Sequence, residues 1–304
     1  MLDLTIIILA HNEEMHIERA LKAVEGLAKR IVVVDSFSTD RTVEIARFEG
    51  AEVLQNKFVN YAKQFEWALE NANIETRWVM RLDADEVVEP DLHQEMLVKV
   101  PSLPSDVAGI NLRRKHIFFD RWIRFGGRYP LILLRIWRHG QGKIEQRWMD
   151  EHMVVWGGRT VEFRGGFSDH NLNDLSFFTD KHNKYAVREA IDVLAKKHSL
   201  FSLDDSLSAS SASMQAAGKR LFKERVYNKL PFWLGPLGYF VYRYTLQLGF
   251  LDGRPGLVYH FLQGGWYRFL VGAKVYEYER QMKTCRNKGE MLHKLQQLTG
   301  HKLT

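Results

Sequence analysis

The sequence contains one cysteine, Cys285, in 304 residues, so no disulfide can form within the chain and a reducing compartment is expected. No run of about 18 uninterrupted apolar residues is present, which argues against a conventional membrane-spanning helix. The first residues lack the basic segment and cleavage site of a signal peptide, so we expect a buried strand there. No Gly-x-Gly-x-x-Gly follows that strand, which argues against a dinucleotide-binding dehydrogenase.

What the first hundred residues do contain is an alternation of apolar, β-branched runs with helical patterns. This order indicates an α/β fold with right-handed crossovers and a doubly wound, mostly parallel sheet. The strands are expected at Leu4–Ala10, Arg30–Val34, Ala51–Gln55 and Arg77–Leu82, and the helices at Ile17–Val24, Thr42–Phe48 and Tyr61–Asn71.

Polar clusters follow three of these strands, at Asn12–Glu14, Asp35–Ser38 and Asp83–Glu86. Ligands of such sheets bind at the carboxyl ends of the strands, so the clusters should meet at one edge. Carboxylates that lie close together raise each other's pKa unless a cation compensates their charge, and three occur here, at Asp83, Asp85 and Glu86. A hard divalent metal ion is a common compensating cation. If the strand period of two continues, Asp83 and Asp85 point to the same side. The alternative is that they precede the next helix, starting at Pro90 or Asp91, as capping residues.

Three segments of the sequence resemble family 2 glycosyltransferases of the GT-A fold. They are Thr5–Glu14, Ile31–Thr42 and Leu82–Glu86, and within the family they are most similar to the lipopolysaccharide-core β-glucosyltransferase group. The resemblance implies a nucleotide-sugar site lined by Ala10, Asn12, Glu14, Asp35, Ser38, Asp83 and Ala84. Asp35 would contact the uracil or ribose, although Ser36 stands where the family often has a second acidic residue.

The resemblance also implies a Mg²⁺ or Mn²⁺ ion. Asp85 would be its principal ligand, Asp83 would approach both ribose and metal, and His170 would complete the shell. A metal neutralises the diphosphate as it leaves, and an inverting transfer needs a separate base for the acceptor hydroxyl.

The base is expected in Arg147–His152, where a carboxylate pair lies beside an imidazole. Glu151 aligns best with the family's acidic residue and Asp150 is its rival; both could instead pair with nearby arginines. Ile144 stands where processive synthases have Gln, so we expect transfer of a single sugar. The residues that we assign to the acceptor or to phosphate are Arg128, Trp148, Lys181 and Tyr185. Strands are expected at Ala108–Leu112 and Leu131–Trp137, with a basic connection between them in which arginines alternate with aromatics around Arg128. This connection suits sugars and phosphates but also a solvated hairpin.

The composition changes near residue 216, which divides the chain into a catalytic domain, 1–215, and a helical region, 216–304. Five cations between Lys219 and Lys229 precede the aromatic stretches Leu230–Tyr242 and Leu257–Tyr278. Basic clusters beside aromatics are typical of helices that lie in a membrane surface. The alternative is a helical subdomain or an interface with a second copy of the chain.

These observations favour an inverting, metal-dependent hexosyltransferase at the cytoplasmic face of the plasma membrane. It would move one sugar, with UDP-hexose the favoured donor, to a lipid-linked saccharide in bacterial surface polysaccharide or lipopolysaccharide synthesis; no nucleic-acid partner is expected. Two alternatives remain. A polyprenyl-phosphate glycosyltransferase usually has definite spanning helices, and a nucleotidyltransferase would have a Gly-rich basic loop where His11–Glu14 stands.

Overall fold

The computed structural model describes residues 1–145, 152–200 and 232–303. These residues form two compact units. The first runs to Leu172 except for the segment Phe125–Gly127, and the second contains that segment and the chain from Asn173 onward. The predicted domain boundary at residue 215 lies outside the described residues, and the division between the units falls earlier, after Leu172.

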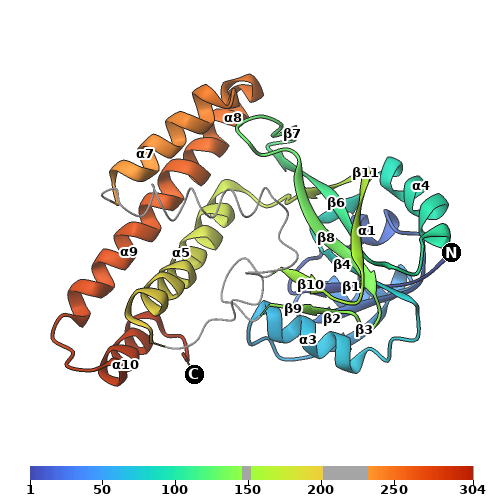
Figure 1. Cartoon of the computed structure of the whole chain (residues 1–304), viewed down its shortest axis with the longest axis horizontal. Helices are drawn as coiled ribbons and strands as arrows, with labels where there is room; N and C mark the ends of the chain where they lie inside the picture. The colour runs from blue at the N-terminus through green and yellow to red at the C-terminus, as the bar shows by residue number, and fades with distance from the viewer. Residues whose placement is uncertain (146–151, 201–231, 304) are drawn as a thin grey trace. The chain divides into compact units, whose positions relative to one another are not determined.

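The first unit is built on a mixed sheet with the strand order β3-β2-β1-β4-β8-β6-β11-β5, and β7 pairs with β6 (Figure 1). The β3-β2-β1-β4 half is parallel, as predicted. Its strands are β1 (Leu2–Ala10), β2 (Ala28–Asp35), β3 (Glu52–Gln55), β4 (Trp78–Asp83), β5 (Glu86–Val88), β6 (Val107–Phe118), β7 (Arg121–Trp122), β8 (Leu131–Arg138) and β11 (Arg159–His170). A separate antiparallel pair consists of β9 (Gly142–Ile144) and β10 (Met153–Val155).

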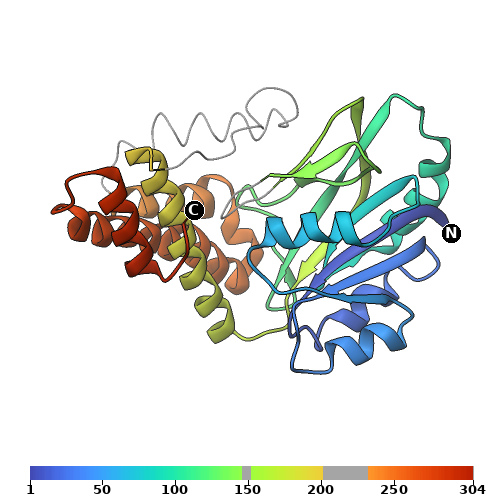
Figure 2. The ribbon, with the colours of Figure 1, turned by 90° about the horizontal axis from the view of Figure 1, so that it is seen from below.

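Helices cover both faces of this sheet (Figure 2). They are α1 (Ile17–Lys22), α2 (Thr42–Phe48), α3 (Tyr61–Asn71) and α4 (Pro90–Lys99), with the 3-10 turn η1 (Val100–Ser102). Alternate residues of β1 point to opposite faces: Ile6 and Ile8 pack in the core with α1, α2 and α4, whereas Ile7 packs with Phe65 of α3. Because both faces are buried, β1 is apolar from Ile6 to Ala10, and the predicted α/β fold is confirmed.

Strand β6 is longer than predicted. We expected a strand at Ala108–Leu112 followed by a basic connection, but Arg113–His116 continue the strand and pair with β8 and β11. The cations are tolerated there because each has an acidic partner: Arg113 pairs with Glu162 at 2.7 Å, and Lys115 pairs with Glu89. Because acidic residues of neighbouring segments neutralise these cations, the chain continues as a strand where its basic composition indicated a loop.

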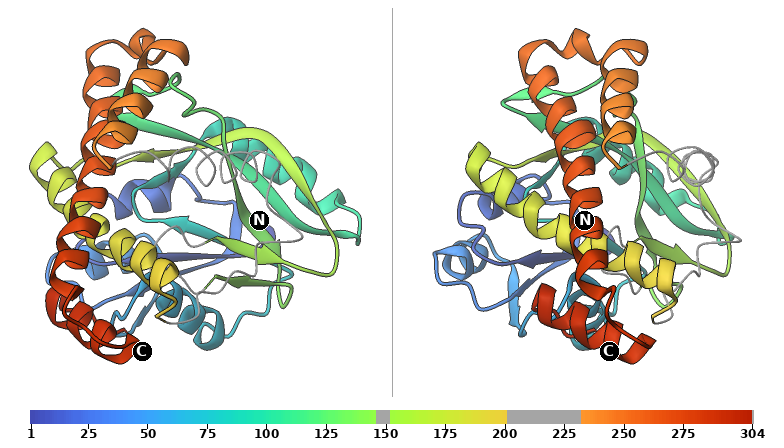
Figure 3. Two further views of the ribbon diagram at one scale, coloured as in Figure 1. Left: turned by 60° about the vertical axis from the view of Figure 1, so that its left-hand side comes forward. Right: turned by 90° about the vertical axis from the view of Figure 1, so that its left-hand side faces the viewer.

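The second unit is helical. It contains α5 (Leu175–His198), α7 (Leu234–Val241), the π-helical turn η4 (Tyr242–Leu246), the 3-10 turn η5 (Gly249–Asp252), α8 (Gly253–His260), the π-helical turn η6 (Phe261–Trp266), α9 (Tyr267–Met282) and α10 (Lys288–Thr299). Helix α5 crosses α9 (Figure 3), and Leu194, Tyr278 and Leu295 join α5, α9 and α10 in one core. Within the described part of the chain, every helix is too short or too polar to cross a bilayer.

Candidate functional site

The carboxyl ends of β1, β2 and β4 lie at one edge of the sheet. Ala10 at the end of β1 pairs with Asp35 at the end of β2, and Leu9 pairs with Asp83 at the end of β4. The Ala10 carbonyl accepts a hydrogen bond of 2.9 Å from the Ser36 backbone, which starts the loop after β2. The three polar clusters of the sequence therefore follow neighbouring strands, as expected.

The loops after β1 and β2 are joined by hydrogen bonds. The Asn12 backbone, with φ at 56°, donates to Ser38 Oγ at 2.9 Å, and Asn12 Oδ1 accepts from the Thr39 backbone at 2.8 Å. The Glu14 backbone donates to the Asp40 carboxylate, and the Arg41 backbone donates to the Glu14 carboxylate, both at 3.1 Å. Asn12, Glu14 and Ser38 thus shape the loops at this edge.

Asp35 is fully buried and organises the second of these loops. Its carboxylate accepts from the Ser38 backbone at 3.0 Å, from the Ser38 hydroxyl and from Gln55 Nε2 at 2.9 Å. The structure thus shows that Asp35 supports the loop, and its expected contact with a nucleotide remains a prediction.

Asp83 is surrounded by cations. Tyr61 donates its hydroxyl to Asp83, and Arg81 and Arg135 lie 3.4 Å and 3.5 Å from its carboxylate. Burial opposes ionisation of this carboxyl, but the two guanidinium groups and the tyrosine outweigh it and hold the pKa of Asp83 well below its usual range. Asp83 is therefore ionised and already has partners within the protein.

Glu86 begins β5 and is buried beneath Asp83. It accepts from Arg135 at 2.6 Å and from the Asp83 backbone at 3.0 Å. Burial, helped by the charge of Asp83, raises the pKa of Glu86 to about 8 despite the attraction of Arg135. The acidic cluster therefore contains two carboxyls with opposite pKa shifts.

Asp85 lies in the turn after β4, because the strand ends at Asp83. The alternation of side chains along the strand therefore does not extend to Asp85. Ala84, between Asp83 and Asp85, is buried. Asp85 Oδ2 accepts from Asn171 at 3.0 Å, and its carbonyl accepts from the His170 backbone at 3.0 Å. The turn is thereby fastened to the end of β11, next to His170.

Helix α1 also holds the end of β11. Arg19 donates to His170 Nδ1 at 3.1 Å and to the His170 carbonyl at 2.5 Å. His16 accepts from the Leu172 backbone at 2.9 Å and contacts Glu13 at 2.6 Å. Asp85 and His170, predicted as metal ligands, are therefore adjacent in the structure, 85 positions apart in the sequence.

A second charged cluster on β6 and β11 centres on Asp169. His116 lies 3.0 Å and Arg114 3.6 Å from its carboxylate. Burial opposes ionisation here too, but His116, Arg114 and Arg128 hold the pKa of Asp169 well below its usual range. Arg128, an expected acceptor or phosphate ligand, thus belongs to this cluster in the first unit.

Other predicted residues lie elsewhere. Trp148, Asp150 and Glu151 lie outside the described residues; the described neighbours of that segment, Glu145 and His152, are joined by a backbone hydrogen bond of 2.9 Å. Lys181 and Tyr185 belong to α5 in the second unit, where the Lys181 ammonium lies 5.9 Å from the Tyr185 ring centroid.

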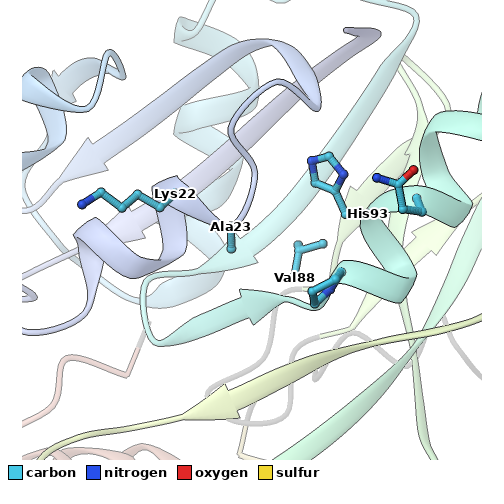
Figure 4. Close-up of a pocket in the computed structure, with 6 residues that line it drawn as sticks. Lys22, Ala23, Val88 and His93 are labelled. Carbon is cyan, nitrogen blue, oxygen red and sulfur yellow. The ribbon is translucent and has the colours of Figure 1, made fainter.

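Among the residues that the structure describes, no three His, Cys, Asp or Glu side chains lie close enough together to hold a metal ion. A hollow of about 240 Å³ on the first unit is lined by Lys22, Ala23, Val88, Pro90, His93 and Gln94 (Figure 4). Its lining contains no carboxylate, unlike the sheet edge at Asp83 and Asp85.

The family model "Glycosyl transferase family 2" matches residues 5–170, more than half of the chain. The chain belongs to glycosyl transferase family 2. The match includes β1, β2 and β4, the turn at Asp85 and His170, and it agrees with the enzyme class and the GT-A fold predicted from the sequence. Membership does not identify the lipopolysaccharide-core group within the family.

Two relatives of this family 2 chain are named "uncharacterized glycosyltransferase". One, from Rickettsia bellii, is 37% identical over 89 residues, which are 29% of this chain and 30% of that protein. The other, from Rickettsia typhi, is 36% identical over the same shares. The chain thus spans less than a third of the length of either relative.

A solved structure of glucosyl-3-phosphoglycerate synthase from Mycobacterium tuberculosis, in complex with Mn²⁺, UDP and glucosyl-3-phosphoglycerate, is 21% identical. The likeness covers 37% of this chain and 43% of that one, with a TM-score of 0.32.

Several residues of the site were not found from the sequence. They are Arg19, Asp40, Tyr61, Arg135 and Asn171, each of which orients one of the predicted acidic residues or the histidine. One signal was available, because Arg135 is a charged residue within the apolar run Leu131–Trp137, and a buried charge in such a strand needs a partner.

Proposed function

We propose that this family 2 chain is an inverting, metal-dependent glycosyltransferase that moves a single hexose from a nucleotide-sugar, with UDP favoured, to a lipid-linked saccharide. The main support is that three features meet at the carboxyl edge of β1, β2 and β4. They are the loop at Asp35, the carboxylate of Asp83, and the turn at Asp85 that is bonded to His170. In a sheet of this kind ligands bind at that edge. The residues of this edge lie within the part of the chain that the family model matches, and on that basis we propose glycosyl transfer there.

On the donor side, the joined loops at Asn12 and Ser38 would hold the nucleoside, and Asp85 with His170 would hold Mg²⁺ or Mn²⁺. A carboxylate and an imidazole suit such an ion, which in proteins is commonly bound by one or two carboxylates together with substrate phosphates. When bound, the ion would neutralise the diphosphate leaving group. Asp83 would keep the Tyr61 hydroxyl and Arg81 in place beside the sugar nucleotide.

On the acceptor side, Glu151 or Asp150 would take the proton of the acceptor hydroxyl. Arg128 is partly buried beside Asp169 and His116, and it would orient a sugar or phosphate of the acceptor. Trp148, Lys181 and Tyr185 remain candidates for the same role.

Membrane association is supported by the surface of the second unit. Large apolar side chains are exposed along α7, η4, η5, α8 and η6; they include Trp233, Leu237, Val241, Leu246, Phe250, Leu257 and Phe261. Between Phe232 and Leu251 the only charged residue is Arg243, which is buried. Apolar and aromatic side chains of this kind suit the interface of a bilayer, where the lipid-borne acceptor would be found. These side chains support the association with a membrane, and the cytoplasmic face is the place that we propose for it.

The donor site is tested with Asp85→Asn. Thermal unfolding is measured with UDP-glucose and Mn²⁺, and with each alone, because a ligand that binds the native state raises the Tm. The wild type should gain stability from the pair of ligands and Asp85→Asn should lose that gain. Asp106→Asn is the matched control, since Asp106 is an exposed carboxylate that pairs with Arg159 on the surface. An equal ligand-induced shift in Asp85→Asn and wild type would refute the site.

The membrane proposal is tested with the double variant Trp233→Ser, Leu237→Ser, in which both side chains are 56% exposed. Co-sedimentation with vesicles of phosphatidylglycerol and phosphatidylcholine should weaken by about tenfold or more, because two apolar side chains no longer leave water. The control Phe48→Ser removes an exposed aromatic of α2 and should bind like wild type. Equal sedimentation of the double variant and wild type would refute the membrane proposal. A smaller oligomer in the double variant would instead identify a second copy of the chain as the partner of this surface.

A further inference from the structure

The environment of His170 contains a cation supplied by the protein itself. Arg19 of α1 donates to both the Nδ1 atom and the carbonyl of His170. Burial lowers the pKa of Arg19, and the nearby Asp85 carboxylate partly opposes this by favouring the charged form. The guanidinium thus contacts His170 directly and lies within electrostatic range of Asp85, the two residues that the proposed function assigns to a metal.

The hydrogen bonds of His170 determine where its proton is. A guanidinium can only donate, so the Nδ1 atom that Arg19 contacts must carry the lone pair. A neutral imidazole then has its proton on Nε2, and this atom faces Asp120 Oδ1, an acceptor, at 3.2 Å. Both ring nitrogens are therefore engaged, Nδ1 as acceptor and Nε2 as donor.

This arrangement conflicts with metal binding at either nitrogen. A metal on Nδ1 needs the lone pair that Arg19 uses. A metal on Nε2 needs the proton to move to Nδ1, where it would face the N–H of Arg19, and two donors cannot bond to each other. In both cases Arg19 has to leave Nδ1 before His170 can become a ligand.

We propose that Arg19 is a resident cation of the Asp85–His170 site, and that a divalent metal reaches His170 only by displacing the Arg19 guanidinium from Nδ1. The inference rests on the proposed function, in which these two residues hold the metal. Arg19 keeps the turn after β4 and the end of β11 in place before the metal arrives, and its hydrogen bonds set the affinity of the site. Arg19 is a positioning residue, since it acts through His170.

The test is the affinity for Mn²⁺ in the presence of UDP, measured on the full chain from the electron paramagnetic resonance signal of free Mn²⁺. Arg19→Met keeps the length of the side chain and removes its hydrogen bonds. It should bind Mn²⁺ roughly tenfold more tightly than wild type, because the metal no longer has to break the hydrogen bond from Arg19 to Nδ1. Arg159→Met is the matched control: it removes an equally charged but exposed arginine, and its affinity should equal that of wild type.

A second variant guards against misfolding of Arg19→Met. Arg19→Lys keeps the charge near Asp85 but cannot make both contacts with one ammonium group, so its affinity should rise by a smaller factor. Nitrogen-15 spectra of the wild type without metal give an independent measurement and should show His170 with its proton on Nε2. A proton on Nδ1, or an Arg19→Met affinity equal to or weaker than that of wild type, would overturn the inference.

His170→Ala separates this inference from the proposed function. If His170→Ala weakens Mn²⁺ binding and Arg19→Met does not strengthen it, only the role of Arg19 is wrong. If His170→Ala has no effect, or if no variant binds Mn²⁺, the proposed metal ligands are wrong and the inference falls with them.

Discussion

Arg135 is the residue whose loss should most disturb the acidic edge of the sheet. Its side chain is 5% exposed and lies between two carboxylates, 2.6 Å from Glu86 and 3.5 Å from Asp83. Arg135→Met keeps most of the volume but leaves Glu86 buried without its closest cation. Removing one partner of a buried ion pair typically costs about 3–5 kcal/mol. For a domain of this size that corresponds to a fall in Tm of roughly 6–20 °C.

The stability lost in Arg135→Met should depend on pH, and the ionisation of Glu86 determines whether the loss grows or shrinks as the pH rises. Burial raises the pKa of Glu86 from 4.5 to about 8 in the folded state, so its contribution to stability is complete below pH 4.5 and is lost as the pH rises through about 8. Arg135 opposes this rise by favouring the charged form. Without Arg135 the pKa of Glu86 increases further, and the variant should therefore lose more stability at pH 9 than at pH 6.

Differential scanning calorimetry at the two pH values measures both effects. At pH 9, where Glu86 is ionised in the folded wild type, the double variant Arg135→Met, Glu86→Gln should regain much of the lost stability, because the buried charge is removed together with its partner. Arg159→Met, on the surface, should shift the Tm little. A cost of Arg135→Met below about 1 kcal/mol, or additive losses in the double variant, would refute the account of a buried cation that compensates Glu86.

Two further predictions concern acid stability and backbone geometry. The pKa values of Asp83 and Asp169 are lowered in the folded state, so these carboxylates stabilise the fold above pH 3.8 and this stabilisation is lost as the pH falls below that value. Asp169→Asn should therefore flatten the decline of Tm between pH 5 and pH 2.5. An unchanged slope would contradict this. Gly126, at φ +66°, has His260 Cε1 2.2 Å from the position of a Cβ atom, so Gly126→Ala should destabilise the second unit by roughly 2–4 kcal/mol in calorimetry. Gly140→Ala, at φ +79° with open space, is the control and should cost about 1–2 kcal/mol; equal losses would exclude the clash with His260.

The parallel half of the sheet could be predicted because its signals are local. A strand buried on both faces carries a continuous apolar run, and β1, β2 and β4 contain such runs at Ile6–Ala10, Ile31–Val34 and Trp78–Met80. The neighbouring positions of Asp35 and Asp83 then follow from parallel pairing, since residues at the ends of such strands share an edge. The end of β6 was missed because its cations indicate a loop unless their partners on other elements are known.

The partners of the acidic residues could not be predicted, because they come from distant parts of the chain. Arg19 meets His170 across 151 positions, and Asn171 meets Asp85 across 86. No periodicity or spacing relates such pairs; only the folded sheet, with α1 beside the end of β11, brings them together. The same holds for Tyr61, which reaches Asp83 from the first turn of α3.

Asp83 at the end of β4 and Asp85 in the turn that follows should therefore respond differently to substitution. Asp83 is ionised between Arg81 and Arg135 and accepts from Tyr61, so Asp83→Asn removes a charge on which two cations depend and should lower the Tm even without ligand. Asp85 is fastened by Asn171 and through its backbone, contacts that an asparagine at that position can largely keep. Asp85→Asn should then leave the ligand-free Tm nearly unchanged and abolish the gain from UDP-glucose with Mn²⁺. The opposite pattern would mean that Asp83, with its arginines displaced, is the residue that meets the donor.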